Sequence, residues 1–428
     1  MFNLVTAALQ LLVVGAISVF EFNRRSVSIF FWAMLLVIFS LPHFASVLLG
    51  NAVYNNATLT MSSLFVIGFS VVYELGRRVH LRERHPKVKL PPIEIDEAEI
   101  EYGISERVAI VAFVLLCIGM LLFSSRIAVD SGGSSWGAIY QAQSEAGISV
   151  ATFAPYIFPA LCGAIAVSIM KRQWPAVFLL CAATLVYLLI SRNRIIALTI
   201  VIPILFLIVT KHKRLTGGQA TLYILLAILI VFFVYALLVF RHAGTLEAFV
   251  RNYDLNSFIS EVFANIFSNE GELGLRNIFY YFVENGNSFA GFNEGASYIR
   301  ILFFWLPGSL SSGVKPDDFA ITMASAYLGL PYNNVYSVHP TFFGDAFANF
   351  NYFGVLLGLL WAAVFNIVDV WLGRMSSHRK TYCISAIGFC LIIIGRGSVY
   401  NGCVMAIVAL LIVKLLDSLN AFKRVSAD

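Results

Sequence analysis

Two sharp turns in this sequence carry arginine between apolar segments, where guanidinium groups could bind an anion. Arg192 and Arg194 lie in Ser-Arg-Asn-Arg, which separates the apolar runs 174–190 and 195–210. Arg396 lies in Gly-Arg-Gly-Ser, which separates the last two apolar runs. Because helix N-termini attract negative charge and guanidinium groups grip phosphate through two parallel hydrogen bonds, both turns predict anion-binding sites. The alternative for each arginine is snorkelling or ion pairing at a helix end.

The polar interval 241–350 holds further cations, several acids and many aromatic residues. Aromatic faces combined with Asn, Asp and Arg are typical of sugar binding, and the same composition also occurs in the aromatic belt at a membrane surface. Residues 298–307, reading Tyr-Ile-Arg-Ile-Leu-Phe-Phe-Trp-Leu-Pro, are apolar but too few to cross a bilayer. We expect this segment to lie at the outer interface and to direct Arg300 toward a cavity.

A polar stripe precedes the next apolar segment. Thr341, Asp345 and Asn349 are spaced four residues apart, so they share one face of a helix. We expect this helix to run on into the apolar segment 351–372. His339 lies just before the stripe, and a histidine beside an acid is a candidate general base. A histidine that only satisfies local hydrogen bonds is the alternative.

The elements that must position these residues are membrane helices. Of the 428 residues, 59% are hydrophobic and 12% are charged, and the mean hydropathy is +0.82, outside the usual range of soluble domains. A bilayer core needs about 20 apolar residues per helix, and such runs recur along the chain. The expected fold is all-α and polytopic, a single integral membrane domain over residues 1–428 with about eleven spans. The approximate spans are 2–20, 28–50, 59–75, 107–124, 150–169, 174–191, 194–210, 219–240, 351–372, 381–395 and 402–417.

The distribution of Lys and Arg orients the chain. Cytoplasmic loops carry an excess of these residues, and most of the 29 fall in one set of alternate loops. This predicts an N-terminus outside, a cytoplasmic C-terminus, a cytoplasmic loop over 76–106 and a large outer loop over 241–350. The cations left on the outer side are almost all arginine, whose planar fork favours bidentate binding of an anion. They are Arg126, Arg192, Arg194, Arg241, Arg251, Arg276, Arg300, Lys315 and Arg396.

The sequence shows no pattern typical of a metal site, a disulfide framework or nucleic-acid binding. The six cysteines all lie inside apolar runs, with neither metal-ligand spacing nor a disulfide framework. A net charge of +5 is ordinary for a membrane protein with basic cytoplasmic loops, so we expect no nucleic-acid partner. No Asp-x-Asp motif lies in an outward loop. We therefore expect neither a metal ion nor a cofactor.

Three segments together resemble the Wzy-type polymerases of oligosaccharide repeat units in bacterial O-antigen and capsule assembly, which are relatives of the O-antigen ligases. They are SRNR at 191–194, FFWLPGSLSSGVKPDD at 303–318 and HPTFFGDAFANFNYFGVLLG at 339–358. With the topology, the resemblance covers nearly the whole chain. Many relatives have Gly-Ser-Arg-Gly where this chain has Ile-Ser-Arg-Asn-Arg, and Asp345 stands where a glutamate is more usual.

The resemblance implies glycosyl transfer on the periplasmic face of the bacterial inner membrane, in lipopolysaccharide or related polysaccharide biosynthesis. A glycan held by undecaprenyl diphosphate would move onto the non-reducing hydroxyl of another lipid-linked unit, so this glycan is both donor and acceptor. The expected diphosphate ligands, which replace a metal ion, are Arg192, Arg194, Arg276, Arg300 and Arg396. His339 or Asp345 would orient or deprotonate the acceptor. The expected sugar contacts are Tyr298, Lys315, Asp317 and Asn349.

The implied partners are membrane lipid, which surrounds the prenyl tails, a chain-length regulator and a flippase. An O-antigen ligase, which transfers the glycan to lipid A core, is the nearest alternative. A polysaccharide or lipid transporter is a further one, although transporters place ionisable residues and broken helices near mid-membrane. Here the mid-span interruptions are few, chiefly Pro42-His43 and Pro203. A non-enzymatic scaffold is the remaining alternative.

Overall fold

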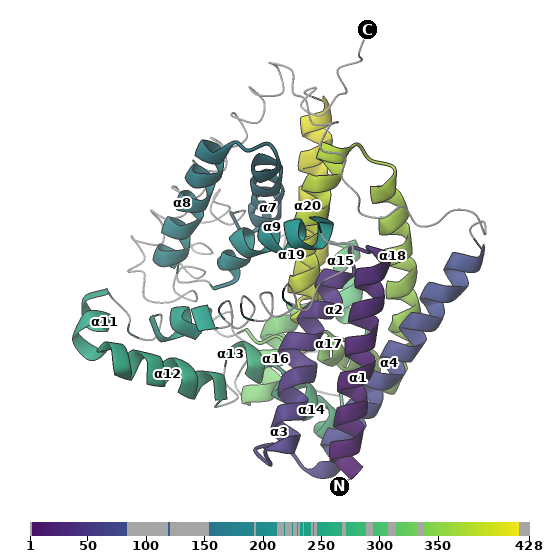
Figure 1. Ribbon diagram of the computed structural model, residues 1–428. Coiled ribbons are helices and arrows are strands. Elements are labelled where there is room, and N and C mark those ends of the chain that lie inside the picture. Colours follow the sequence, from purple (N-terminus) through teal and green to yellow (C-terminus); the bar gives the residue numbers. More distant parts are fainter. Residues whose placement is uncertain are drawn as a thin grey trace. The chain divides into compact units, whose positions relative to one another are not determined.

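The computed structural model describes residues 2–83, 154–191, 194–211, 235–240, 246–267, 271–287, 294–306, 314–329 and 337–418, with a few single positions between these ranges. Over these residues the regular structure is entirely helical, as Figure 1 shows, which confirms the predicted all-α fold. The chain divides into two compact units. The first comprises Met1–Glu94, Glu272–Met375 and Cys390–Ile407, and the second comprises Ile95–Gly271, Ser376–Phe389 and Val408–Asp428.

The first unit is built from long apolar helices and several short ones. These are α1 (Phe2–Arg24), α2 (Ile29–Leu35), the π-turn η1 (Leu36–Ser40), α3 (Leu41–Leu48), α4 (Asn56–Glu83), α14 (Arg276–Asn285), α15 (Ala296–Leu302), α16 (Phe319–Leu328), α17 (Thr341–Phe350), the 3-10 segment η6 (Asn351–Leu356) and α18 (Leu357–Gly373). The segment from α2 to α3 is continuous and lies beside α1 (Figure 1). Pro42 falls in the first turn of α3, where a missing N–H group is tolerated, and the π-turn precedes it.

Small residues bring α4 and α18 into close contact. A Cβ atom at Gly358 would lie 2.7 Å from the carbonyl oxygen of Phe69, and one at Gly76 would lie 2.8 Å from the Cβ of Ala362. Glycine at such positions lets membrane helices approach each other closely. Because residues further along α4 meet residues further along α18, the two helices run in the same direction.

The helix α17 does not continue into α18 but runs in the opposite direction beside it. The prediction of one uninterrupted helix that runs on into the segment 351–372 is therefore wrong. Its Phe347 ring lies 5.4 Å from the ring of Phe65, whereas its Phe342 ring lies 5.3 Å from that of Phe69. The helix α17 is therefore antiparallel to both α4 and α18. The reversal falls at Asn351, which has a φ of 50°. As a result, the N-terminus of α17 lies in the interior of the unit, near the midpoint of α4.

The second unit and the helices shared by both units supply the remaining elements. They are α7 (Ala154–Met170), α8 (Trp174–Ser191), the 3-10 turn η4 (Arg194–Ala197), α9 (Leu198–Lys211), α11 (Leu246–Asn252), α12 (Leu255–Phe267), α13 (Gly271–Gly274), α19 (Ser377–Gly395) and α20 (Val399–Ser418). Each predicted span within the described residues coincides with a helix. The spans predicted at 107–124 and 219–240 lie largely outside the described residues, as does most of the predicted loop 76–106. The interval 241–350 is largely helical where it is described.

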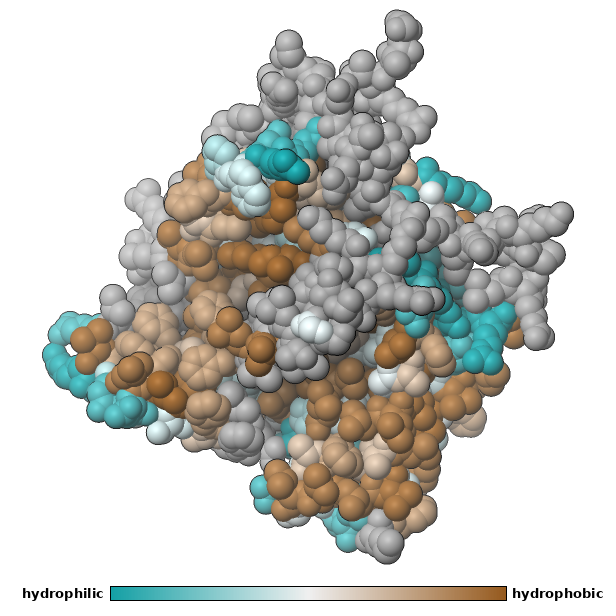
Figure 2. Space-filling view, viewed as in Figure 1, coloured by the Kyte–Doolittle hydropathy of each residue, from teal (hydrophilic) through white to brown (hydrophobic). Residues whose placement is uncertain are grey.

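Four helical segments of the described chain are long and apolar enough to cross a membrane, namely Phe2–Arg24, Ile29–Leu48, Asn56–Val79 and Thr341–Gly373. The last of these includes the reversal between α17 and α18. Shorter apolar helices lie at Tyr156–Met170, Trp174–Leu188, Ile195–Leu207, Phe319–Leu328 and Val399–Leu415. Large apolar side chains of α1 and α4, including Leu12 and Leu75, are exposed, and Figure 2 shows a broad hydrophobic surface over this region. The chain is thus a helical, multi-pass membrane protein.

Candidate functional site

The turn between α19 and α20 meets the N-terminus of α17 inside the first unit. The Thr341 amide donates a 3.1 Å hydrogen bond to the carbonyl oxygen of Arg396. Gly397 has a φ of 98°, and a Cβ atom there would lie 2.6 Å from the carbonyl oxygen of Thr341. Thr341 itself has a φ of 63°, which is strained for a β-branched residue. Gly397 therefore admits the backbone of α17, and the backbone of Arg396 is fixed beside that helix end.

Two cations predicted from the outward loop converge on one aromatic ring. The Arg300 guanidinium lies 4.7 Å from the ring centroid of Tyr400, and the Lys315 ammonium lies 5.8 Å from the same centroid. Arg300 donates to the carbonyl of Pro316 at 2.7 Å and pairs with Asp318 at 3.3 Å. Tyr400 begins the first turn of α20, four residues after Arg396. We call Arg300 and Lys315 over Tyr400 the cation pair.

A group of buried polar residues surrounds α17, and we call Ser297, Tyr298, Thr341, Asp345 and Asn349 the α17 polar cluster. The Asn349 amide donates to Asp345 Oδ1 at 3.2 Å, and its carbonyl oxygen accepts from the Ser297 backbone amide at 3.2 Å. Burial, together with the nearby Asp345 carboxyl, raises the pKa of the Tyr298 hydroxyl well above its usual value. The cluster therefore joins α15 to α17.

Several buried atoms of the α17 polar cluster have no hydrogen-bond partner among the described residues. These atoms are Thr341 Oγ1, which is the clearest case, and Ser297 Oγ, the Tyr298 hydroxyl and Asp345 Oδ2. Ser297 and Asp345 lie near each other, and Tyr298 lies near the Trp361 indole, without hydrogen bonds of good geometry. Native proteins pair nearly all buried polar atoms with protein or water, so a group of orphaned ones requires an explanation. A polar ligand or ordered water that entered beside α17 would supply the missing partners.

In the sequence, His339 lies between Lys315 of the cation pair and Thr341 of the α17 polar cluster. It is half-buried and directly precedes Pro340, the residue before α17. The adjacent Val338 amide donates to the carbonyl oxygen of Ala320 at 3.0 Å, which fixes this strand of chain against the first turn of α16. Asp318, the ion partner of Arg300, caps the same turn by accepting from the Ala320 amide. Asp317 beside it is exposed.

Arg276 belongs to a different part of the unit. It is buried at the start of α14, where it donates to the Leu273 carbonyl oxygen and to the hydroxyl of Tyr280. The same hydroxyl lies 2.5 Å from Nδ1 of His43, whose Nε2 lies 2.8 Å from the hydroxyl of Ser63. This buried chain of hydrogen bonds was not predicted; its one sequence signal was a histidine inside an apolar span.

A second unpredicted group lies where α1, α4 and α18 end, and we call it the ionic cluster. The fully buried Arg77 donates to Glu21 at 2.8 Å and to Asp369 at 2.8 Å. Asp369 also accepts from the backbone amide of Val27 at 3.0 Å and from the Ser26 hydroxyl at 2.7 Å. It thereby fastens the turn between α1 and α2 to α18.

The structure brings together six of the predicted site residues, namely Tyr298, Arg300, Lys315, Asp345, Asn349 and Arg396. His339 adjoins them through Pro340. Arg192 lies outside the described residues, and Arg194 begins η4 in the second unit. Over the described residues, no group of three or more His, Cys, Asp or Glu side chains is placed to hold a metal ion. The chain matches no protein-family model, no curated protein and no solved structure.

Proposed function

We propose that this protein is a Wzy-type, metal-independent glycosyltransferase that polymerises undecaprenyl-diphosphate-linked repeat units on the periplasmic face of the bacterial inner membrane. The observation that carries the proposal is the meeting of Arg396 and the cation pair with the orphaned polar atoms of the α17 polar cluster. Cations suit a diphosphate, and unpartnered buried polar atoms suit sugar hydroxyls. Both lie in a bundle whose apolar surface suits prenyl chains.

In this reaction the acceptor hydroxyl forms a bond to the anomeric carbon of the donor sugar while the bond from that carbon to the diphosphate oxygen breaks. The departing diphosphate gains negative charge, which preorganised cations stabilise. Arg300, held by Pro316 and Asp318, and Lys315, held by a 3.1 Å bond to the Leu306 carbonyl, are fixed in advance of the reaction. Arg396, whose backbone carbonyl accepts from the Thr341 amide, is our third candidate for this role.

The two candidate bases differ in their surroundings. Asp345 is fully buried and bonded to Asn349, so it suits orienting a hydroxyl more than exchanging a proton with water. His339 is half-buried in a loop and is our assignment for the group that accepts the acceptor proton. Arg276, engaged with Tyr280 and Leu273, supports the fold around α14 in this proposal.

The proposed topology has about eleven spans, a periplasmic N-terminus and a cytoplasmic C-terminus, because Lys and Arg gather on the cytoplasmic side. It places the ends of α1, α4 and α18 that carry the ionic cluster at the cytoplasmic face. The interval 241–350 then lies on the periplasmic side with α17 entering the bundle from it. Cysteine-labelling at positions 191–194 tests this orientation, because modification only from the cytosol would exclude an outer turn.

The test of function is elongation of a radiolabelled lipid-linked repeat unit by the purified protein in detergent. We expect Arg300→Ala and Arg396→Ala each to lower the rate about a hundredfold or more, as loss of an oxyanion-stabilising donor does. Arg192→Ala should abolish elongation, with poor rescue by Arg192→Lys. Arg251→Ala is the matched control, since Arg251 pairs only with its helix neighbour Glu247 at an exposed site. No elongation by the unsubstituted protein, or equal rates in all variants, would refute the proposal.

A transporter of the same lipid-linked glycan is the second candidate, and α17 is the observation that favours it. Transporters place the N-termini of interrupted helices at interior binding sites. Proteoliposomes loaded with labelled lipid-linked glycan distinguish the two, because movement across the bilayer without chain growth indicates transport. For an O-antigen ligase, deletion of the gene would remove glycan-capped lipid A core, whereas loss of a polymerase leaves single-repeat chains.

A further inference from the structure

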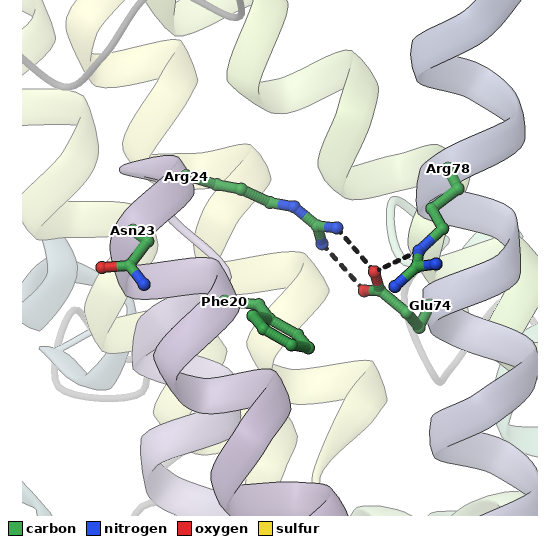
Figure 3. Close-up of a pocket in the computed structure, with 5 residues that line it drawn as sticks. All are labelled: Phe20, Asn23, Arg24, Glu74 and Arg78. Atoms are coloured by element: carbon green, nitrogen blue, oxygen red, sulfur yellow. Dashed lines mark hydrogen bonds and ion pairs between the residues drawn. The ribbon is translucent and has the colours of Figure 1, made fainter.

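A pocket of about 250 Å³ opens in the first unit between the last turns of α1 and α4, separate from the candidate site described above. It is lined by Phe20, Asn23, Arg24, Glu74 and Arg78 (Figure 3). Figure 3 shows the Arg24 guanidinium reaching Glu74 from α1 and the Arg78 guanidinium reaching it from the next turn of α4, with the Phe20 ring beside the opening. The pocket thus combines two cations with an aromatic wall.

Of the two arginines in the pocket, Arg78 is the one that the ion pairs engage less. Glu74 receives Arg24 at 2.7 Å and 2.9 Å and the Nε of Arg78 at 2.9 Å. Arg24 also donates to Glu21, so it is held from both sides and is only 21% exposed. Arg78 uses its Nε for Glu74, while its side chain is 64% exposed. Arg78 lines the pocket, and no hydrogen bond from its terminal amino groups is seen among the described residues.

The surroundings of the pocket are those of a lipid contact. On α4, Val71 and Leu75 precede Arg78 on the same helix face and are exposed. On α1, Leu12 and Phe20 are exposed in the same way. This exposed apolar surface next to the pocket can contact acyl chains.

The charge of the sequence that follows Arg78 indicates which kind of lipid the pocket would bind. The sequence from residue 78 to 89, RVHLRERHPKVK, which begins after the buried Arg77, holds many cations and a single acid, Glu83. Clusters of Lys and Arg next to a membrane span attract anionic lipids, by about 1 kcal/mol for each residue near the surface. We propose that this pocket binds the phosphate headgroup of an anionic phospholipid, with Arg78 as the principal ligand. The site is independent of the glycosyl-transfer proposal.

Native mass spectrometry of the purified full-length protein tests the site, with phosphatidylglycerol and phosphatidylcholine as competing lipids. We expect phosphatidylglycerol to remain bound preferentially, and Arg78→Gln to weaken its binding about fivefold. Arg374→Gln is the matched control, because Arg374 is an exposed arginine at the corresponding end of α18. Phe20→Ala, which changes no charge, should also weaken binding. If Arg78→Gln fails to fold, Phe20→Ala provides the test.

Three results would overturn the assignment. Equal retention of the two lipids would remove the preference for an anionic headgroup. Equal weakening by Arg374→Gln and Arg78→Gln would show a general effect of surface charge and no defined site. Saturation of the protein by glycerol 3-phosphate at the concentrations that suffice for phosphatidylglycerol would indicate a soluble phosphate ligand in place of a lipid.

Discussion

Replacing Arg77 by methionine tests the ionic cluster most directly. The guanidinium donates to Glu21 at 3.2 Å and 2.8 Å, to Asn366 at 2.6 Å and to Asp369 at 2.8 Å, all within the interior. Methionine fills a similar volume and removes every one of these bonds. Glu21 then keeps Arg24 and Ser28, and Asp369 keeps Ser26 and the Val27 amide.

Removing one partner of a buried ion pair leaves an uncompensated charge and costs about 3–5 kcal/mol. We therefore expect Arg77→Met to lower the free energy of unfolding in mixed micelles by about that amount. Arg78→Met is the matched control, since the Arg78 side chain is 64% exposed, Glu74 keeps Arg24 without it, and exposed ion pairs contribute about 1 kcal/mol or less. Adding Asp369→Asn to Arg77→Met should recover part of the loss, because Asp369 is the carboxylate that is left without a cation, whereas Glu21 keeps Arg24. If the two single variants unfolded with free energies within 1 kcal/mol of each other, the ionic cluster would not be a stabilising element.

Three further predictions concern the candidate site and its supports. Gly397→Ala should lower stability by about 2 kcal/mol or more and slow elongation, because the new Cβ would meet Thr341, whereas Gly50→Ala, at φ 70° with open space around it, should cost about 1 kcal/mol. Tyr280→Phe should cost about 1–3 kcal/mol in a denaturant titration by leaving its buried partners unsatisfied, and a similar loss in Tyr352→Phe, an exposed tyrosine, would count against this reason. Burial raises the pKa of Tyr54, Tyr280 and Tyr298 in the folded protein. Above about pH 10 the unfolded chain loses these protons while the folded protein keeps them, so the free energy of unfolding should fall as the pH rises. Exposed tyrosines ionise near pH 10 in the folded protein as well, so the prediction would be contradicted if the folded protein reached the full tyrosinate absorbance of the unfolded chain before it unfolded.

The positions of most helices could be predicted from the sequence, because an apolar run of membrane length has few alternatives to a helix. The interruption of the segment 339–372 could not. A single stretch of apolar residues gives no local signal that Asn351 adopts a positive φ and reverses the chain. The reversal depends on tertiary contacts, in which the Phe342, Phe343 and Phe347 rings fill the space beside α4.

The roles of the arginines, too, could be predicted only as far as they depend on nearby residues of the sequence. Charge distribution predicts on which side of a membrane a guanidinium lies, and it cannot tell whether the protein itself neutralises that group. Arg77 meets Glu21 and Asp369, which are 56 and 292 residues away in the sequence, so its burial has no local signature. Arg276 is likewise engaged inside the fold. Arg300 also has an ion partner, Asp318, but it is partly exposed, lies against the Tyr400 ring and keeps an Nε without a partner among the described residues. Among the predicted arginines, those near the α17 polar cluster are therefore the ones whose substitution should change chemistry more than folding.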